Sequence, residues 1–455
     1  MKIRLSDKIV VSQGPLFDIK DPKRWGPFQF PRAYLLEDGK IAVSLYNGQE
    51  TEFGCKRIYF ISEDNGYTWK SAPFDIQDHC GLLLPNGDKL LETEEPGTVI
   101  DADFIPWGYY CASILPGQEP EKGNLYRGKP RTLFLGGAEW KESQNMPRPY
   151  AITYSQYGQQ LRLYLHETLP EGIAQKALPY YRLKKGSNKP IKEFSPLLDW
   201  DYFFSNCVVS GDKLVFAPPS ATGRLRLAPD GSLWTATSNY NKLAINPSNG
   251  AVIPSAVSFF LRSDDNGKSF HLVSFLEHIR DSSKEPELSA GFLEPEIAFL
   301  PDGSIFALLR TTEACSSLCH EFAPLYCARS EDLGKTWSKP TRFADSGVLP
   351  KLCALKCGTT IAAYARMGTY IRKTDDPSGK IWDEPIEILP NTDRAPLGNS
   401  PHPAQFTQEY SGSCENVDLI ALSDNEAMLF YTDFYYPDKD GIKRKTLFAQ
   451  RITIE

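Results

Sequence analysis

Apolar and polar residues alternate with a period of two along much of this chain, as they do in half-buried β-strands. Residues 161–166, Leu-Arg-Leu-Tyr-Leu-His, form one such segment, and residues 445–454 near the C-terminus form another. Long segments with the helical period are scarce. The pattern therefore predicts an all-β protein.

Short turns of the form Leu-x-Asp/Asn-Gly recur between these β-like segments. They lie at 36–39, 84–87 and 300–303, with variants at 228–231, 355–358 and 422–425. Glycine supplies the positive φ that a tight reversal needs, so each turn predicts a β-hairpin. Repeats of this length are typical of β-propellers, whose blades are four-stranded antiparallel sheets.

A second repeat reads Ser-x-Asp-x-Gly-x-Thr/Ser-Trp/Phe. It occurs at 62–69, 263–270 and 330–337, with a looser copy at 374–382. Ser and Asp side chains bond to nearby backbone N–H groups and so close a turn. The aromatic residue is expected to fold beneath the turn as a hydrophobic plug. We therefore expect structural rather than catalytic roles for Asp64, Asp265 and Asp332.

Together the two repeats predict one domain over residues 1–455 that contains six blades, with seven as the alternative. The blades are expected at about 25–72, 78–195, 203–275, 291–340, 347–388 and 410–453. The second is longer than the others, which predicts loop insertions between residues 94 and 196. Residues 445–454 are expected to close the ring.

The Ser-x-Asp-x-Gly repeat resembles the Asp-box, or BNR repeat, of the sialidase superfamily. As architecture the resemblance covers nearly the whole chain, and it implies a six-bladed propeller that acts on glycans. In that family the Asp-boxes lie on the outer rim, away from the catalytic face. No cofactor is expected, and no metal site either, because the Cys315–Cys319 and Cys353–Cys357 spacings differ from the usual C-x2-C.

Residues 291–311 carry the strongest candidate for chemistry. Their alternation predicts two strands joined by a Pro-Asp-Gly turn, which places Glu294 and Arg310 at the same end of neighbouring strands. The segment is similar to a sialidase motif in which the Glu polarises the nucleophile and the Arg helps to clamp the substrate carboxylate. An ordinary ion pair across a hairpin is the alternative, and we favour the catalytic interpretation.

Further arginines are candidates for substrate binding, because a guanidinium holds a carboxylate through two parallel hydrogen bonds. Where sialidases have Phe-Arg-Ile-Pro, this chain has Phe-Gln-Phe-Pro followed by Arg32. That form also resembles propeller glycosidases that act on arabinan. The third sialidase Arg corresponds to Arg366, with Arg372 as the alternative.

The last blade departs from the sialidase pattern. Where that family has a catalytic Tyr before a Ser-Asp-Leu strand, this chain has Glu415 and Asn416. A nucleophilic Glu415 acting with Glu294 suits a neutral sugar, since two carboxylates then flank the glycosidic bond. A Tyr suits a sugar that already bears a carboxylate at its anomeric carbon. Tyr431 and Tyr410 are therefore alternatives.

Two further roles have candidates of their own. Asp433 is a candidate for the carboxylate that orients the first Arg in sialidases. The general acid is expected among Asp78, Asp101 and Asp103, although loop aspartates mostly cap turns. If the chain were a polysaccharide lyase, His79 or His402 would supply the base.

Composition limits the partners. The net charge of −7 argues against nucleic acid or a membrane surface as the main partner. The N-terminus lacks a signal-peptide pattern and no apolar run approaches a membrane span, so we expect a cytoplasmic protein, secreted only if a leader was removed. The ten cysteines are expected to be free thiols.

These observations together predict an exo-acting glycoside hydrolase that removes a terminal, acidic sugar from a glycan. A hydrolase of neutral or arabinan-type chains is the first alternative. A non-catalytic carbohydrate-binding propeller is the second, because the propeller fold hosts many unrelated functions.

Overall fold

The computed structural model describes residues 1–14, 28–46, 57–91, 110–114, 131–136, 151–154, 160–165, 177–196, 224–245, 252–277, 291–311, 324–365, 368–390 and 416–455. These residues form β-strands, turns and one 3-10 helix, η2 (Phe74–His79), with no α-helix in the described ranges. The chain has the six-bladed β-propeller fold, built of four-stranded antiparallel sheets. The predicted fold class is therefore confirmed.

One compact unit comprises residues 1–83, 186–189 and 294–455. Its first sheet contains β3 (Gln29–Leu35), β4 (Ile41–Tyr46), β5 (Arg57–Ser62) and β6 (Lys70–Ala72). A second contains β19 (Phe292–Phe299), β20 (Ile305–Thr311), β21 (Leu325–Ser330) and β22 (Thr341–Ala344). A third contains β23 (Val348–Ala354), β24 (Thr360–Ala365), β25 (Thr369–Thr374) and β26 (Ile386–Leu389). The last sheet contains β27 (Val417–Ala421), β28 (Glu426–Pro437) and β29 (Lys443–Ile454).

The other unit comprises residues 84–185 and 190–293. One of its sheets contains β8 (Lys89–Leu91), β13 (Ala177–Leu183) and β14 (Ile191–Pro196), and another contains β15 (Arg226–Leu227), β16 (Leu233–Ile245), β17 (Val252–Ser263) and β18 (His271–Glu277). Strand β7 (Gly81–Leu83) is part of the first unit. Between β8 and β13 the chain forms a further four-stranded sheet of β9 (Tyr110–Ile114), β10 (Arg131–Gly136), β11 (Ala151–Tyr154) and β12 (Gln160–Leu165). The described residues of this insertion, which was expected as loops, therefore form a sheet.

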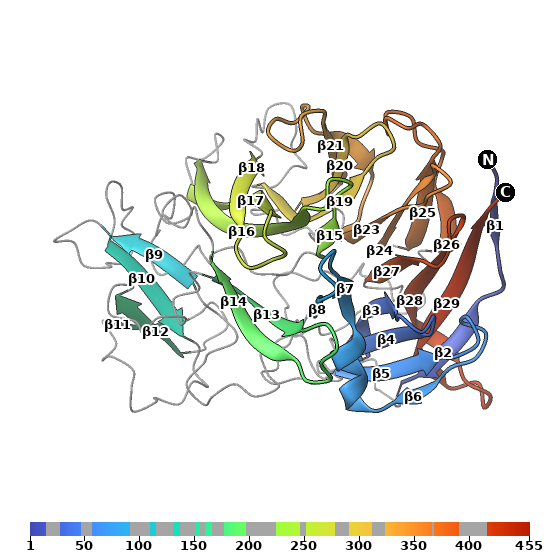
Figure 1. The fold of residues 1–455 in the computed structure, drawn as a ribbon. Coiled ribbons are helices and arrows are strands. Elements are labelled where there is room, and N and C mark those ends of the chain that lie inside the picture. The colour runs from blue at the N-terminus through green and yellow to red at the C-terminus, as the bar shows by residue number, and fades with distance from the viewer. Residues whose placement is uncertain are drawn as a thin grey trace. The chain divides into compact units, whose positions relative to one another are not determined.

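Within the first unit, the opening strands of successive blades lie next to one another. Strand β27 contacts both β23 and β3 (Figure 1). Apolar residues of neighbouring sheets share one core there, which includes Ile361, Leu419, Leu429 and Phe448. Because these strands contact other blades as well as their own sheet, polar groups on them are largely buried. Any site at the ends of these strands is therefore built on rigid elements.

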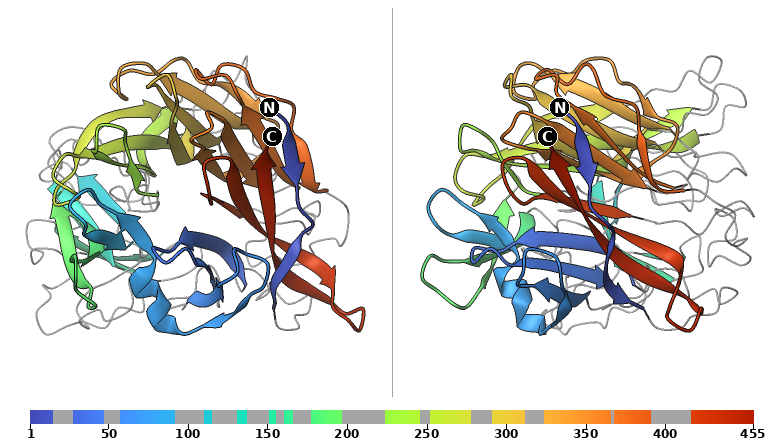
Figure 2. Two further views of the ribbon diagram at one scale, coloured as in Figure 1. Left: turned by 45° about the vertical axis from the view of Figure 1, so that its right-hand side comes forward. Right: turned by 90° about the vertical axis from the view of Figure 1, so that its right-hand side faces the viewer.

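The last blade contains strands from the N-terminus of the chain in addition to β29. The N-terminal strands β1 (Ile3–Leu5) and β2 (Ile9–Gln13) both pair with β29, and Ile3 stands opposite Ile454. The backbone N–H of Lys2 donates to the carbonyl of Glu455 at 2.8 Å, and Figure 2 shows the two termini side by side. The expectation that residues 445–454 close the ring is corrected accordingly: the N-terminal strands add the outer edge of this blade.

The Ser-x-Asp-x-Gly segments form the turns that their sequence predicts. In the first copy, the Ser62 hydroxyl donates to Asp64 and accepts the N–H of Gly66 at 2.7 Å. Asp64 accepts both the hydroxyl and the N–H of Thr68, and these two bonds lower the pKa of Asp64 to about 2. The copies at 263–270 and 330–337 contain the same set of bonds.

The aromatic residues of these segments pack between blades. The Trp69 indole N–H donates to the Gly66 carbonyl at 3.1 Å, and its ring lies edge-on to Phe430 of β28 with centroids 5.7 Å apart. Trp382 bonds to Gly379 in the same way and packs against Phe306 of the neighbouring blade. In these two segments the plug predicted beneath the turn therefore also joins adjacent blades.

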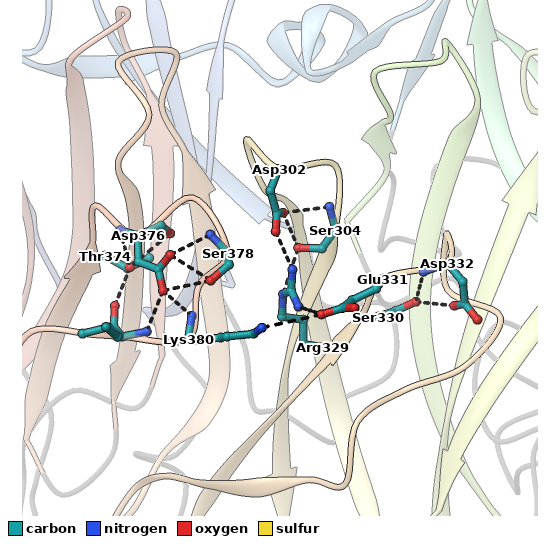
Figure 3. Close-up of polar contacts among 11 residues, drawn as sticks. Asp302, Ser304, Arg329, Ser330, Glu331, Asp332, Thr374, Asp376, Ser378 and Lys380 are labelled. Carbon is teal, nitrogen blue, oxygen red and sulfur yellow. Dashed lines mark hydrogen bonds and ion pairs between the residues drawn. The ribbon is translucent and has the colours of Figure 1, made fainter.

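Ion pairs join the same hairpins across a blade boundary (Figure 3). Arg329 of β21 pairs with Asp302 and Glu331, and Lys380 of the next blade lies 3.7 Å from Glu331. Asp376 accepts the N–H and the hydroxyl of Ser378 at 2.9 and 2.8 Å. These acidic groups are engaged in turn bonds and ion pairs, as expected for structural residues.

Candidate functional site

Glu294 and Arg310, predicted to meet at one end of a hairpin, form an ion pair. Nη1 of Arg310, in β20, donates to Oε1 of Glu294, in β19, at 2.5 Å. The second carboxylate oxygen of Glu294 accepts the backbone N–H of Leu349, in β23 of the next blade, at 2.9 Å. Both oxygens are therefore held, and the orientation of the carboxylate is defined by two blades.

Arg310 retains unused hydrogen-bonding capacity. Its side chain is 10% exposed, and its Nε atom is buried with no hydrogen-bond partner in the described part of the chain. A guanidinium carries five N–H donors in one plane, and a buried donor without an acceptor costs free energy. A bound acceptor would remove that cost, so this arginine is suited to bind a carboxylate or a sugar hydroxyl.

Strained backbone recurs at the start of three inner strands. The residues Phe30, Glu294 and Leu349 have φ values of 55°, 45° and 40°. Each precedes a proline (Pro31, Pro295 and Pro350) that stands eight residues before a hairpin glycine (Gly39, Gly303 and Gly358). Positive φ is unfavourable for residues with a side chain and concentrates at functional sites.

Two of these segments form β-bulges, as the register of strand pairing shows. In β3 the register jumps from Gln29 opposite Tyr46 to Arg32 opposite Ser44. In β23 it jumps in the same way between Val348 and Lys351. Proline lacks an N–H, so it fits a bulge without loss of a ladder bond.

Arg32 follows its bulge directly and is 6% exposed. Gln29, at the place where the sialidase motif has its Arg, is fully buried. The first blade therefore carries a neutral amide at the motif position and places its guanidinium three residues later. This difference agrees with the departure read from the sequence.

Two other predicted substrate contacts have packing roles in the structure. Arg372 donates to the carbonyls of Phe343 and Asp383, and its guanidinium lies 4.5 Å from the centre of the Phe343 ring. Tyr431 is 1% exposed and packs against Phe448 within the core. Because both side chains are engaged by the protein itself, we do not include them in the proposed site.

Asp433 also lies in the interior. It is 1% exposed, and its Oδ1 accepts the N–H of Tyr435 at 2.9 Å. Asp78 lies within η2, but its side chain is not among those described. Asp101, Arg366 and Glu415 lie outside the described residues, as do Asp103, Tyr410 and His402, so their roles stay predictions.

Asp418 was missed by sequence reasoning. It is fully buried in β27, and its carboxylate accepts the N–H of Ala33 at 2.5 Å and that of Leu419 at 3.0 Å. A charged residue inside the otherwise apolar run 417–421 was the available signal. Buried charges are rare unless they are bonded.

The described residues contain no cluster of His, Cys, Asp and Glu that could hold a metal ion. Cys80, Cys327, Cys353 and Cys357 are free thiols, and burial raises the pKa of Cys327. No helix in the described part of the chain is long and apolar enough to cross a membrane.

No family model matches the sequence, and no curated protein matches it. Similar solved structures include a protein of unknown function from Dyadobacter fermentans DSM 18053, at 15% identity and a TM-score of 0.56, over 100% of this chain and 99% of that one. They also include an α-L-arabinanase from Penicillium chrysogenum, at 12% identity and a TM-score of 0.45, over 98% of both chains.

A mutant of NanB sialidase from Streptococcus pneumoniae is similar at 10% identity and a TM-score of 0.47, over 98% of this chain and 70% of that one. Sialidases and an arabinanase are thus among the structural neighbours, as the sequence resemblance predicted. At these identities the similarity concerns the fold alone, and the chemistry has to be argued from the residues.

Proposed function

We propose that this chain is an exo-acting glycoside hydrolase of the sialidase-like type, which removes a terminal acidic sugar from a glycan. The observation that supports it most is the Glu294–Arg310 pair, in which the carboxylate is held from two blades while the guanidinium keeps a buried donor without a partner. A structural ion pair would not need to leave that donor unsatisfied.

In this proposal Arg310 binds the carboxylate of the sugar through the guanidinium atoms that Glu294 does not occupy. The Glu294 carboxylate limits the rotation of the guanidinium, so the loss of entropy on binding is small. Arg32 and Arg366 are the further cations that we assign to the site. Each charge-assisted hydrogen bond contributes about 1.5–3 kcal/mol.

Glu294 has a second role in the proposal, which is to polarise the nucleophile. For a sugar with a carboxylate at its anomeric carbon, a neutral Tyr is the suited nucleophile, and sialidases are an exception to the two-carboxylate scheme. Tyr431 does not fit this role because it is buried in the core. Tyr410 and Glu415 are the remaining candidates.

Hydrolysis of a neutral or arabinan-type sugar is the second candidate. It is favoured by Gln29, a fully buried neutral residue where a first carboxylate-binding Arg would stand. It also suits Glu415 as the partner of Glu294, since two carboxyl groups about 5–5.5 Å apart support a retaining reaction and about 6.5–9.5 Å apart an inverting one.

A panel of aryl glycosides tests both candidates: a sialoside, a glucuronide, an α-L-arabinofuranoside and a galactoside. Release from the sialoside or the glucuronide, abolished in Arg310→Ala, supports the first proposal. Release from the arabinofuranoside or the galactoside supports the second. Absence of release from every substrate, together with saturable binding of a glycan, would instead identify a non-catalytic carbohydrate-binding protein.

A further inference from the structure

The segment that carries Arg32 has an unusual backbone. Phe28 and Phe30 have φ values of 60° and 55°, and Phe30-Pro31 forms the bulge that immediately precedes Arg32. A segment with two positive-φ side-chain residues keeps one conformation only where surrounding bonds hold it. The position of Arg32 therefore depends on the groups that bond to this backbone.

Arg57 holds the bulge from strand β5, which is separated from β3 by β4. Its side chain is buried, and its Nη2 donates to the Phe30 carbonyl at 2.6 Å while its Nε donates to the Ser44 hydroxyl at 2.8 Å. Ser44 in turn donates to the Arg32 carbonyl at 3.3 Å. The guanidinium also lies over the Tyr46 ring, 4.7 Å from its centre. One arginine thus fixes the backbone on both sides of Pro31.

Asp418 holds the same segment from the adjacent blade. Its carboxylate accepts the N–H of Ala33, the residue after Arg32, at 2.5 Å. Strands β27 and β3 are in contact along this boundary. The boundary between β19 and β23 has the same arrangement, where the Glu294 carboxylate accepts the N–H of Leu349 beside another proline. Both carboxylates therefore join a neighbouring blade next to a predicted substrate-binding segment.

Buried charges are a costly way to stabilise a fold. An apolar residue of similar size often stabilises a protein as well as a buried charged group, so such charges point to a need for one defined geometry. Here the bonds of Arg57 and Asp418 converge on four residues, 30–33. We propose that Asp418 and Arg57 are positioning residues for Arg32, which hold its backbone in the geometry required for binding sugar. The sugar-binding part of this inference rests on the proposed function.

Hydrogen exchange measured by mass spectrometry on the full chain tests the structural step without any substrate. Asp418→Asn keeps the shape of the side chain but replaces a charge-assisted bond with a neutral one, which is about half as strong. We expect exchange of peptides covering residues 28–35 to become at least about fivefold faster. Asp88→Asn is the matched control, because Asp88 is also buried and accepts a backbone N–H, that of Lys185. It should accelerate exchange near Lys185 and leave residues 28–35 unchanged.

Kinetics on the glycoside that the wild-type protein hydrolyses test the functional step. Asp418→Asn and Arg57→Met should raise KM at least about tenfold with a smaller change in kcat, as expected when substrate binding is weakened. Arg57→Lys keeps the charge and should recover part of the affinity, whereas Asp88→Asn should change neither constant. If Asp418→Asn does not fold, Arg57→Lys and Ser44→Ala test the same segment by both measurements.

Unchanged exchange at residues 28–35 in the variants overturns the proposal, and so does faster exchange with an unchanged KM. If the wild-type protein hydrolyses none of the four glycosides, the proposed function fails separately. Exchange then still decides whether Asp418 and Arg57 hold the segment, and binding of the same panel of sugars replaces KM as the measure of affinity.

Discussion

Glu294 and Leu349 belong to different blades, yet the Glu294 carboxylate accepts the Leu349 N–H at 2.9 Å and both residues have positive φ. Each conformation is costly by about 1–3 kcal/mol for a residue with a side chain. The bond joins two strained segments, and Arg310 binds the other oxygen of the same carboxylate. The geometry of the candidate site therefore depends on how two blades meet.

Arg310→Ala should reduce kcat/KM by at least about 100-fold, since it removes a charged donor aimed at the substrate. Unfolding in denaturant should show a smaller loss, about 1–2 kcal/mol, because 26% of the Glu294 side chain is exposed to water. Arg310→Lys should restore stability more than turnover, since an ammonium does not reproduce the planar donors. Arg329→Ala, which breaks the ion pair with Asp302, is the control and should leave turnover unchanged. Wild-type turnover in Arg310→Ala would mean that the pair is structural.

Tyr431→Phe separates a packing role from a nucleophilic one. The hydroxyl donates a long hydrogen bond to Gln450 Oε1 at 3.5 Å, and the loss of this bond should change the free energy of unfolding by less than about 1 kcal/mol. Turnover of the best glycoside should remain within about threefold of wild type, because the ring still fills the core. Loss of activity in a stable Tyr431→Phe protein would restore Tyr431 as a nucleophile candidate.

Gly66→Ala should destabilise the protein through contact between blades. A Cβ atom at this position would lie 2.4 Å from Cε of Met428, and the φ of Gly66 is +92°. Overpacking costs about 1–3 kcal/mol, and the backbone conformation adds about 1 kcal/mol. Gly39→Ala is the control, with φ +81° and no atom within 4 Å of the added Cβ, so it should show the backbone cost alone. Equal losses in the two variants would show that Met428 moves aside.

Acid stability should depend on the aspartates of the Ser-x-Asp-x-Gly turns. Hydrogen bonds from the Thr68 and Thr336 side chains and N–H groups lower the pKa values of Asp64 and Asp332 from 3.8 to about 2. A lowered folded-state pKa stabilises the protein above pH 3.8, and this contribution is lost as the pH falls towards 2. Unfolding of Asp64→Asn and Asp332→Asn, measured between pH 2 and 7, should therefore show a weaker dependence on pH than wild type in the acid range. Turnover at neutral pH should be unchanged; a large loss would argue for a role in the reaction.

The sequence by itself determined the features that depend on neighbours in the chain. The period of two, the Asp-Gly turns and the Ser-x-Asp-x-Gly bonds act within a few residues, so they predict hairpins and blades directly. Glu294 and Arg310 belong to this class, because one hairpin separates them by 16 residues.

Only the tertiary structure decided what depends on distant residues. Asp418 bonds to Ala33 across 385 positions of the chain, and no local pattern specifies such a pair. Tyr431 shows the same limit of local patterns. The sequence made it a candidate for the pocket, but packing between blades buries its side chain. The N-terminal strand at the edge of the last blade, and the sheet formed within the second, likewise arise from pairing between segments far apart in sequence. Which groups at such separations become hydrogen-bond partners depends on how whole blades pack against one another, and the periodicity of the amino-acid sequence does not specify that packing.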